Sequence, residues 1–445
     1  MPPILALTLC TIFVLFILKL DREQYPEASL ALWVPTVWML MNATKPLAIW
    51  FGAGGVSMEE GSALDRNVLI VLAVLGFMIL SRRRLNWSNA IKENGWVFAV
   101  LGFMFISVGW SDMPFVSFKR WIRVMIAVIM AFVVATETSP IDALKCIIRR
   151  SIYILIPLSY VLIHYYPHLG REYNRWSGGL MWTGVASQKN GLTALCLIAL
   201  FFLVWTFVNR RRTQEKPATP YQKYVELFLL MLALLLFAGP NHTLKYSATS
   251  TGALAAGLFL FGGMLWLKRR NIIPAPNTLS LLIGSVIVLG TIIPFTQGFL
   301  LSDVAFLFDR SSTLTDRTDI WAQCIHYAMK KPLLGYGFGG FWNDAMRSEI
   351  YSDAHNGYLG TILNIGFVGL IFFSMYFINS ARQAGRMMHR NFEWGCLWIC
   401  LLLMALLHNM TESSQTSFTG FSSALLLFLL VTGNAINNHK NVKND

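Results

Sequence analysis

Long apolar blocks recur along the whole chain, and they constrain its fold more than any other feature. Each block runs for roughly 15 to 25 residues, close to the ~20 that a helix needs to cross about 30 Å of hydrocarbon. Of the 445 residues, 55% are apolar and only 13% are charged, whereas a soluble domain carries about a quarter charged residues. The chain is therefore expected to be an all-α polytopic integral membrane protein, and a water-soluble globule is excluded.

About 12 transmembrane helices are predicted, or about 13 if the N-terminal region crosses fully. The blocks lie at residues 2–20, 29–50, 67–81, 95–110, 121–136, 146–165, 187–208, 225–239, 251–267, 278–298, 356–380, 395–409 and 416–433. Segment 29–50 contains Pro35 and Lys45-Pro46, so a broken or re-entrant span is an alternative to a full crossing. Residues 2–20 lack the basic start and cleavage site of a signal peptide, and we expect a retained first helix.

The net charge of +13 follows largely from membrane topology. Clusters of basic residues occupy every second connection between blocks: Arg82-Arg83-Arg84, Lys145 with Arg149-Arg150, Arg210-Arg211-Arg212, Lys268-Arg269-Arg270, and Arg382 with Arg386 and Arg390. The positive-inside rule places these connections in the cytoplasm and the intervening ones on the other side. Nucleic-acid binding is therefore not expected from the positive charge.

Four parts are predicted along the chain. Residues 1–298 form an N-terminal transmembrane bundle of about ten spans, 299–355 a large external loop domain, 356–433 the C-terminal transmembrane helices, and 434–445 a cytoplasmic tail. Within the loop domain a helix is expected to start at 316–321. The Gly-rich run 335–341 that follows is predicted to form a turn approaching the membrane surface, because no strand precedes it as a dinucleotide-binding loop requires.

The six cysteines indicate neither a disulfide framework nor a metal site. They lie mostly inside apolar blocks and form no CxxC pair. Cys396 and Cys400 share a helix face, which two small hydrophobic residues of a membrane helix explain. We expect no metal and no other cofactor.

A spaced pattern near the end of the loop domain carries the sharpest functional signal. His355-Asn356 stands where a helix is predicted to begin, and Gly366-Phe367-Val368-Gly369 follows nine residues later. An isolated His-Asn pair would most simply cap the helix. The full pattern resembles the signature of the O-antigen ligase and the O-antigen and exopolysaccharide (Wzy-type) polymerase superfamily, membrane enzymes that take a glycan from undecaprenyl diphosphate. The small pair Gly366 and Gly369, one turn apart, is expected to let a second helix pack closely.

Further landmarks agree with this resemblance from about residue 30 to residue 430. They are Trp110 to Pro114 with Ser117, Lys119 and Arg120; Gly184 to Gly191; Thr313 to Trp321; and Asn409 to Glu412. Their order and spacing look like those of the exopolysaccharide-polymerase branch. The implied fold is that of a GT-C-like glycosyltransferase.

The resemblance implies an inverting, metal-independent transfer in which a histidine deprotonates the acceptor hydroxyl. His355 takes the place of that base. Basic residues of the predicted external side are then candidates to hold the diphosphate of the donor, and they are Arg317, Lys189, Arg175, Lys245 and Arg310. Arg317 is the foremost, because it matches the arginine of the family's Leu-Thr-Gly-Arg-Thr-like run and a guanidinium can grip phosphate oxygens with two donors.

Each assignment has a structural alternative. Arg317 is alternatively a loop arginine paired with Asp316 or Asp319, and Lys189 alternatively extends to lipid phosphate. Asn356, Asn190 and Glu412 are candidates to contact the acceptor or to support the site, and Glu412 either orients His355 or caps the last helix. Relatives often carry a Ser-Arg pair where this chain has Ser247-Ala248, so Lys245 is the candidate replacement for that arginine.

Two classes of function fit this sequence. The first is a glycosyltransferase in the bacterial inner membrane with its active site facing the periplasm, either polymerising undecaprenyl-diphosphate-linked oligosaccharides or ligating them to lipid A core or a protein hydroxyl. Its partners would be the lipid-linked donor, a growing polysaccharide or lipid A core acceptor, membrane lipid and, optionally, a chain-length regulator. The second is a flippase of lipid-linked glycans, which would need repeated halves with broken helices that the sequence does not show.

Overall fold

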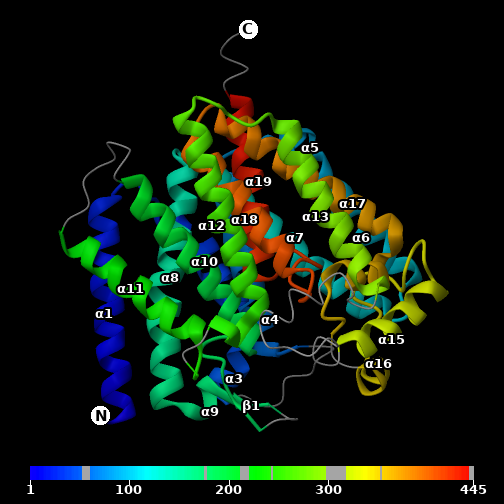
Figure 1. Cartoon of the computed structure of the whole chain (residues 1–445), viewed down its shortest axis with the longest axis horizontal. Helices are drawn as coiled ribbons and strands as arrows, with labels where there is room; N and C mark the ends of the chain where they lie inside the picture. The colour runs from blue at the N-terminus through cyan, green and yellow to red at the C-terminus, as the bar shows by residue number, and fades with distance from the viewer. Residues whose placement is uncertain are drawn as a thin grey trace. The chain divides into compact units, whose positions relative to one another are not determined.

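The computed structural model describes residues 1–52, 61–174, 178–210, 220–241, 244–296, 317–350 and 353–439. Nearly all regular structure in these ranges is helical (Figure 1). Two three-residue strands, β1 (Arg171–Tyr173) and β2 (Leu180–Trp182), form an antiparallel hairpin with Glu172 opposite Met181. The predicted all-α class is confirmed.

Two compact units can be distinguished, each assembled from segments that are distant in sequence. The first comprises residues 1–56, 62–82 and 133–254, and the second residues 57–61, 83–132 and 255–445. The first contains α1 (Pro3–Gln24), η1 (Leu30–Leu32), α2 (Trp33–Ala43), α3 (Leu47–Phe51), α4 (Ala63–Arg82), α8 (Pro140–Tyr165), α9 (Pro167–Gly170), α10 (Lys189–Arg210), α11 (Pro220–Ala238), η3 (Leu244–Ser247) and the hairpin.

The second unit holds the C-terminal half of the chain and two earlier helices. It contains α5 (Trp87–Glu93), α6 (Gly95–Ile106), η2 (Ser107–Trp110), α13 (Pro276–Phe295), α15 (Arg317–Lys330), α16 (Asp344–Glu349), α17 (Gly357–Met388), α18 (Phe392–His408) and α19 (Phe421–His439). Two further helices, α7 (Pro114–Ala135) and α12 (Ala248–Arg269), contribute residues to both units. Within the described residues, each apolar block of the sequence overlaps at least one helix.

Within the described ranges, eight helices are long and apolar enough to cross a membrane: α1, α4, α8, α10, α11, α12, α13 and α17. The pair α5 and α6–η2 is long and apolar enough only when taken together, and it would count as a ninth span. That span would be a broken one, because the pair is bent by 93° at Asn94. Three shorter apolar helices lie at Leu30–Ala43, Phe392–His408 and Phe421–Asn437. The protein is therefore a multi-pass membrane protein.

The segment 29–50 is interrupted, as its prolines predicted. Helix α2 ends at Ala43, the chain is extended at Thr44, and the short α3 starts after Pro46. Lys45 in the break is 7% exposed, and its Nζ donates to Thr183 Oγ1 at 3.2 Å and to the carbonyl oxygens of Gly184 and Ala186. The backbone N–H of Lys45 also donates to Val185 O at 2.8 Å, so both polar groups of this residue are satisfied inside the protein, as a membrane segment requires.

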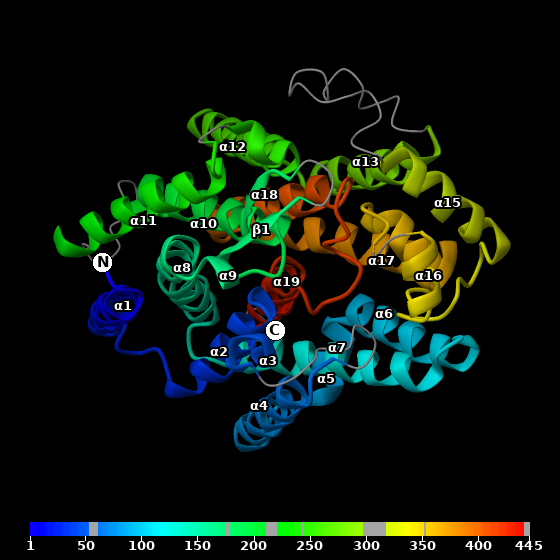
Figure 2. The same cartoon turned by 90° about the horizontal axis from the view of Figure 1, so that it is seen from below.

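Helix α17 is the central element of the second unit, packing against α6, α13, α15, α18 and α19. Figure 2 shows α18 beside it and α13 along it. The helix is interrupted at Ile365 and Gly366, where the backbone leaves helical geometry. The turn 331–335 fills the interruption: Tyr336 N donates to Leu363 O at 2.9 Å, and Phe367 N donates to Pro332 O at 2.8 Å.

Gly366 was expected to contact a second helix. At the interruption its neighbour is instead the turn 331–335. Gly366 has φ +67°, and a Cβ built there would lie 2.0 Å from Leu333 O. A Cβ on Gly369 would meet the side chain of Ile365, within the same helix. The two glycines therefore let α17 break and receive a backbone turn.

The Gly-rich run 335–341 also packs on protein, where an approach to the membrane surface was expected. Gly337 has φ +87°, and a Cβ there would lie 2.6 Å from Ser111 Cα. Phe338 N donates to Ser107 Oγ at 3.0 Å, and Arg120 donates to Gly339 O. The run therefore joins the end of η2 to the interruption in α17.

Candidate functional site

His355 precedes α17 in a conformation that few residues other than glycine adopt. Its φ is +48°, in the left-handed region. Asn356 is the N-cap of α17, and its Oδ1 accepts from Leu359 N at 2.8 Å. Its Nδ2 donates to Gly290 O at 3.1 Å and to Met410 O at 2.8 Å. Asn356 is fully buried, so it positions His355 by joining α13, α17 and the loop after α18.

The loop after α18 carries the carboxylate of the site. Gly357 N donates to Asn409 O at 2.9 Å, and a Cβ on Gly357 would lie 1.9 Å from Asn409 Oδ1. That oxygen accepts from Gln415 N at 2.8 Å, while Glu412 N donates to His408 O at 3.1 Å. The absence of a side chain on Gly357 is thus what lets this loop lie against the start of α17 and bring Glu412 to His355.

Arg317 enters from the first residue of α15. One turn further on the same face, Trp321 is fully buried, and its Nε1 donates to Ala354 O at 3.1 Å. Ile320, Cys324 and Ala328 complete the buried stripe of the helix. Helix α15 therefore holds Ala354, the residue before His355, and also directs Arg317 into the site.

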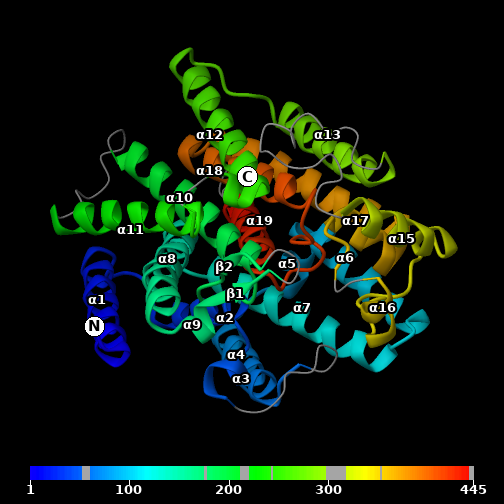
Figure 3. The ribbon, with the colours of Figure 1, turned by 60° about the horizontal axis from the view of Figure 1, so that its bottom comes forward.

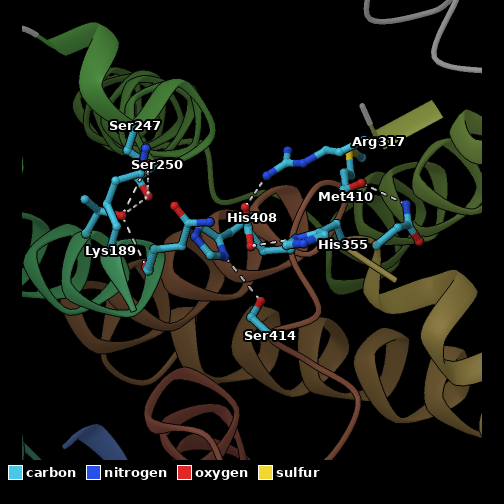
Figure 4. Close-up of polar contacts among 12 residues, drawn as sticks. Lys189, Ser247, Ser250, Arg317, His355, His408, Met410 and Ser414 are labelled. Carbon is cyan, nitrogen blue, oxygen red and sulfur yellow. Dashed lines mark hydrogen bonds and ion pairs between the residues drawn. The ribbon is translucent and has the colours of Figure 1, made fainter. Parts of the chain in front are cut away.

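Arg317 and His355, both labelled in Figure 4, meet at the carboxylate of Glu412. Arg317 Nη2 lies 2.5 Å from Glu412 Oε1, and His355 Nδ1 lies 3.6 Å from Glu412 Oε2. The side chains of Arg317 and Glu412 are 13% and 11% exposed, and that of His355 is 22% exposed. Glu412 therefore bridges the basic residue and the histidine in a half-enclosed site.

Charge and burial act against each other on these groups. Burial alone would raise the pKa of Glu412, but the charges of Arg317 and of the nearby His355 hold that pKa below its ordinary value. Burial alone would lower the pKa of His355, but the nearby carboxylate of Glu412 and the charge of Asp353 raise it above the ordinary value, although Arg317 opposes them. Glu412 thus makes His355 a stronger base.

Two further titratable residues border this site, and the sequence analysis did not select them. Burial raises the pKa of Asp353, opposed by the charge of His355 and a hydrogen bond from Ser413. His408 ends α18, is 4% exposed, and has Nδ1 3.3 Å from Ser414 Oγ. Their spacing was a usable signal, since Asp353 lies two residues before His355 and His408 lies one helical turn before Glu412.

The remaining predicted donor-binding residues are not among those that the structure brings to Glu412. Lys189 and Asn190 begin α10 in the first unit, where Lys189 Nζ donates to Tyr246 O at 3.3 Å and lies 4.9 Å from the centre of the Tyr246 ring. Asn190 O accepts from Thr193 Oγ1 at 3.2 Å. Lys245 belongs to η3, but its side chain lies outside the described part of the chain, as do Arg175 and Arg310. The residues shown to assemble are Arg317, His355, Asn356 and Glu412.

This assembly has the parts needed for acid–base chemistry beside an anion. A guanidinium offers paired donors to phosphate oxygens. A carboxylate at Nδ1 of a histidine orients the ring and favours proton uptake at Nε2. Both groups lie at helix ends, since Arg317 begins α15 and His355 precedes α17.

A comparison with known protein families covers part of this site. The O-antigen ligase family model matches residues 242–374, a range that includes Arg317, His355 and Asn356. The exopolysaccharide production protein ExoQ of Rhizobium meliloti (strain 1021) is 26% identical over 302 residues. That match spans 64% of this chain and 64% of the relative, so the chain covers slightly less than two thirds of the relative's length. The family model and this relative together support the resemblance of the chain to the O-antigen ligase and polymerase superfamily.

Proposed function

We propose that the protein is a glycosyltransferase that extends a glycan by transferring oligosaccharide units from a polyprenyl diphosphate, as a Wzy-type polymerase does. The observation that carries this proposal is the Arg317–Glu412–His355 cluster, which joins a candidate diphosphate ligand to a candidate base. The similarity to ExoQ, an exopolysaccharide production protein, supports polymerase over other activities of the superfamily.

In the proposed reaction His355 accepts the proton of the acceptor hydroxyl. The acceptor oxygen forms a bond to the anomeric carbon while the bond from that carbon to the diphosphate oxygen breaks. Its electron pair leaves with the polyprenyl diphosphate, and the configuration at the anomeric carbon inverts. Arg317 stabilises the charge that develops on the leaving diphosphate. Lys189, Arg175, Lys245 and Arg310 remain proposed contributors to donor binding, and we propose that no metal takes part.

Glu412 would couple donor binding to the strength of the base. In the structure Arg317 is paired with Glu412, so the guanidinium has to exchange a carboxylate oxygen for a phosphate oxygen when the donor binds. Glu412 then interacts with His355 without competition from Arg317, whose charge opposes proton uptake by the imidazole. Donor binding would thus activate His355.

We place the protein in the bacterial inner membrane with this site facing the periplasm. Support comes from the basic clusters Arg82-Arg83-Arg84 and Lys268-Arg269-Arg270 at helix ends, which the positive-inside rule assigns to the cytoplasm. Arg149 and Arg150, expected in such a connection, are instead buried within α8 and paired with Asp21, so they give no topology signal. The site is built at the start of α15, at the start of α17 and after the end of α18. The connections that carry Arg210 and Lys268 to Arg270 are assigned to the cytoplasm. A lipid-linked donor already translocated across the membrane would be within reach of the site.

The alternative within the superfamily is ligation of the glycan to lipid A core or to a protein hydroxyl, favoured by the O-antigen ligase description of the family model. One experiment separates the two activities. The purified protein in proteoliposomes is incubated with undecaprenyl-diphosphate-linked oligosaccharide alone. A ladder of longer lipid-linked products indicates polymerase, and product that forms only after lipid A core or a peptide is added indicates ligase. Transfer in neither arm would contradict the proposal and leave the flippase hypothesis to be tested by translocation.

A further inference from the structure

A groove between α13 and α17 is separate from the Glu412 cluster. It has a volume of about 770 Å³ and is lined from Asn277 to Leu289 along α13 and by Ile378 and Arg382 of α17. Figure 3 shows the two helices side by side. The Glu412 cluster lies near the other end of α13, where Gly290 O accepts from Asn356, the residue next to His355. No step of the proposed reaction uses this groove.

The walls of the groove suit a single hydrocarbon chain. Leu281, Val288 and Leu289 are 72%, 56% and 50% exposed, while Gly284 contributes no side chain and widens the groove. From Asn277 to Leu289 the helix rises about 18 Å at ~1.5 Å per residue. Since the hydrocarbon core is about 30 Å thick, the groove spans roughly one leaflet. Its length therefore matches one acyl chain of a membrane lipid.

The polar end of the groove is positive. Asn277 lies in the first turn of α13, whose N-cap, Ala275, makes no side-chain capping hydrogen bond. Gly385 allows α17 to come close to that turn, because a Cβ there would lie 2.7 Å from Pro276 Cα. Arg382, one turn earlier on α17, lines the same end of the groove. A guanidinium, an amide and a helix N-terminus together favour a phosphate group.

We propose that this groove binds an anionic glycerophospholipid, with its phosphate at Arg382 and Asn277 and one acyl chain along α13. The polyprenyl diphosphate of the donor is a poorer fit, because its phosphates would lie at Arg317, near the opposite end of α13. Arg386 and Arg390 follow Arg382 on the same helix end, and such basic clusters beside membrane helices attract anionic lipid. The proposal does not depend on the enzymatic activity.

Native mass spectrometry of the full-length protein in mild detergent, titrated with phosphatidylglycerol, tests the proposal. Arg382→Gln should reduce the fraction carrying one bound lipid at least fivefold. Arg386→Gln removes the same charge one turn further along α17, outside the groove lining, and should reduce this fraction much less than Arg382→Gln, because Arg386 contributes only general attraction to anionic lipid. Gly284→Leu should also reduce binding, because a Cβ there contacts only Ile378 Cδ1 at 3.9 Å and the longer side chain fills the groove.

Equal lipid retention in Arg382→Gln and Arg386→Gln would overturn the proposal. So would displacement of phosphatidylglycerol by equimolar undecaprenyl phosphate, which would assign the groove to the polyprenyl chain. The Arg382→Gln comparison stands without Gly284→Leu, so a folding defect in the glycine variant leaves the test intact.

Discussion

Glu412 is the residue on which the candidate site depends, because one carboxylate serves two partners with different roles. Its Oε1 is paired with Arg317, and its Oε2 faces Nδ1 of His355. A buried carboxylate left with neither partner would be costly, and a buried charge that loses its partner typically costs about 3–5 kcal/mol. Changes at Glu412 should therefore affect both the base and the donor site.

Replacing Glu412 by Gln should shift the pH dependence of glycan transfer. Glu412 raises the pKa of His355, so its removal lowers that pKa, and the imidazole stays neutral to lower pH. Since the proposed base acts in its neutral form, the acidic limb of the rate–pH profile should move to lower pH while the plateau rate falls, because the base is weaker. Initial rates over a pH series measure both effects.

Glu349→Gln is the matched control for this change. Glu349 ends α16 and accepts a hydrogen bond from Tyr327 at 2.6 Å, away from His355. Its profile should coincide with that of the unmodified protein. An unchanged acidic limb in Glu412→Gln would contradict the role of Glu412 in raising the basicity of His355.

Two variants of Arg317 test its proposed contact with the donor diphosphate. Arg317→Ala should raise the KM for the lipid-linked donor and lower kcat, with a combined loss of about 10²- to 10³-fold as expected for a lost transition-state donor. Arg317→Lys should restore part of kcat, because charge is kept while the paired donors are lost. Lys330→Ala, at the other end of α15, is the control. Equal activity of all three variants would show that Arg317 does not contact the donor.

At the level of elements, the interruption in α17 organises the second unit. Residues 357–364 form a short helix that presents His355, and the longer part follows after Gly366. The turn 331–335 satisfies the backbone groups exposed between the two parts. The two halves of α17 are thus joined through a segment that precedes them in the chain.

Gly366→Ala should destabilise the protein, since its φ of +67° disfavours any side chain and a Cβ would collide with Leu333 O. Backbone strain of this kind costs about 1–3 kcal/mol, and the collision adds to it. Gly262→Ala in α12 is the control, because a Cβ there meets no atom within 4 Å. Thermal unfolding in detergent should show a lower midpoint for Gly366→Ala alone. Equal midpoints would contradict this account of the interruption.

The sequence predicted the helices well because apolar length is a local property. The blocks, the break at Lys45-Pro46 and the helix that starts at 316–321 all follow from residues that are adjacent in the chain. The packing of 335–341 against Ser107 and Ser111, and the role of Gly366, did not follow. Both depend on contacts between residues that lie far apart in the chain, which no local pattern contains.

The same distinction applies to the site. The spaced His355-Asn356 pattern and the Asn409 to Glu412 landmark selected residues that do assemble. The direct pairing of Arg317 with Glu412, 95 residues apart, could not be read from the sequence, where Asp316 and Asp319 were the nearer partners. His408 and Asp353 were missed because a lone histidine at the end of an apolar helix and a loop aspartate are common.

At the scale of the whole molecule, the basic clusters predict which ends of the helices face the cytoplasm. Ser81 adjoins Arg82-Arg83-Arg84, whereas Ser348 lies on α16 in the segment before His355, and both are exposed. A membrane-impermeant maleimide added to intact spheroplasts should label a Ser348→Cys variant and should label Ser81→Cys only after permeabilisation. The native cysteines, mostly buried, provide the background. Labelling of Ser81→Cys in intact cells would contradict the assigned orientation.

The central claim is that His355 acts as the base in transfer of a glycan from polyprenyl diphosphate, and its most direct test is a single comparison. Purified His355→Ala and the unmodified protein are given the same undecaprenyl-diphosphate-linked oligosaccharide and acceptor, after circular dichroism and thermal unfolding show that both are folded. Product formation by His355→Ala should fall by about 10²- to 10⁴-fold, the usual contribution of a general base. An unchanged rate of product formation in a folded His355→Ala protein would contradict the claim.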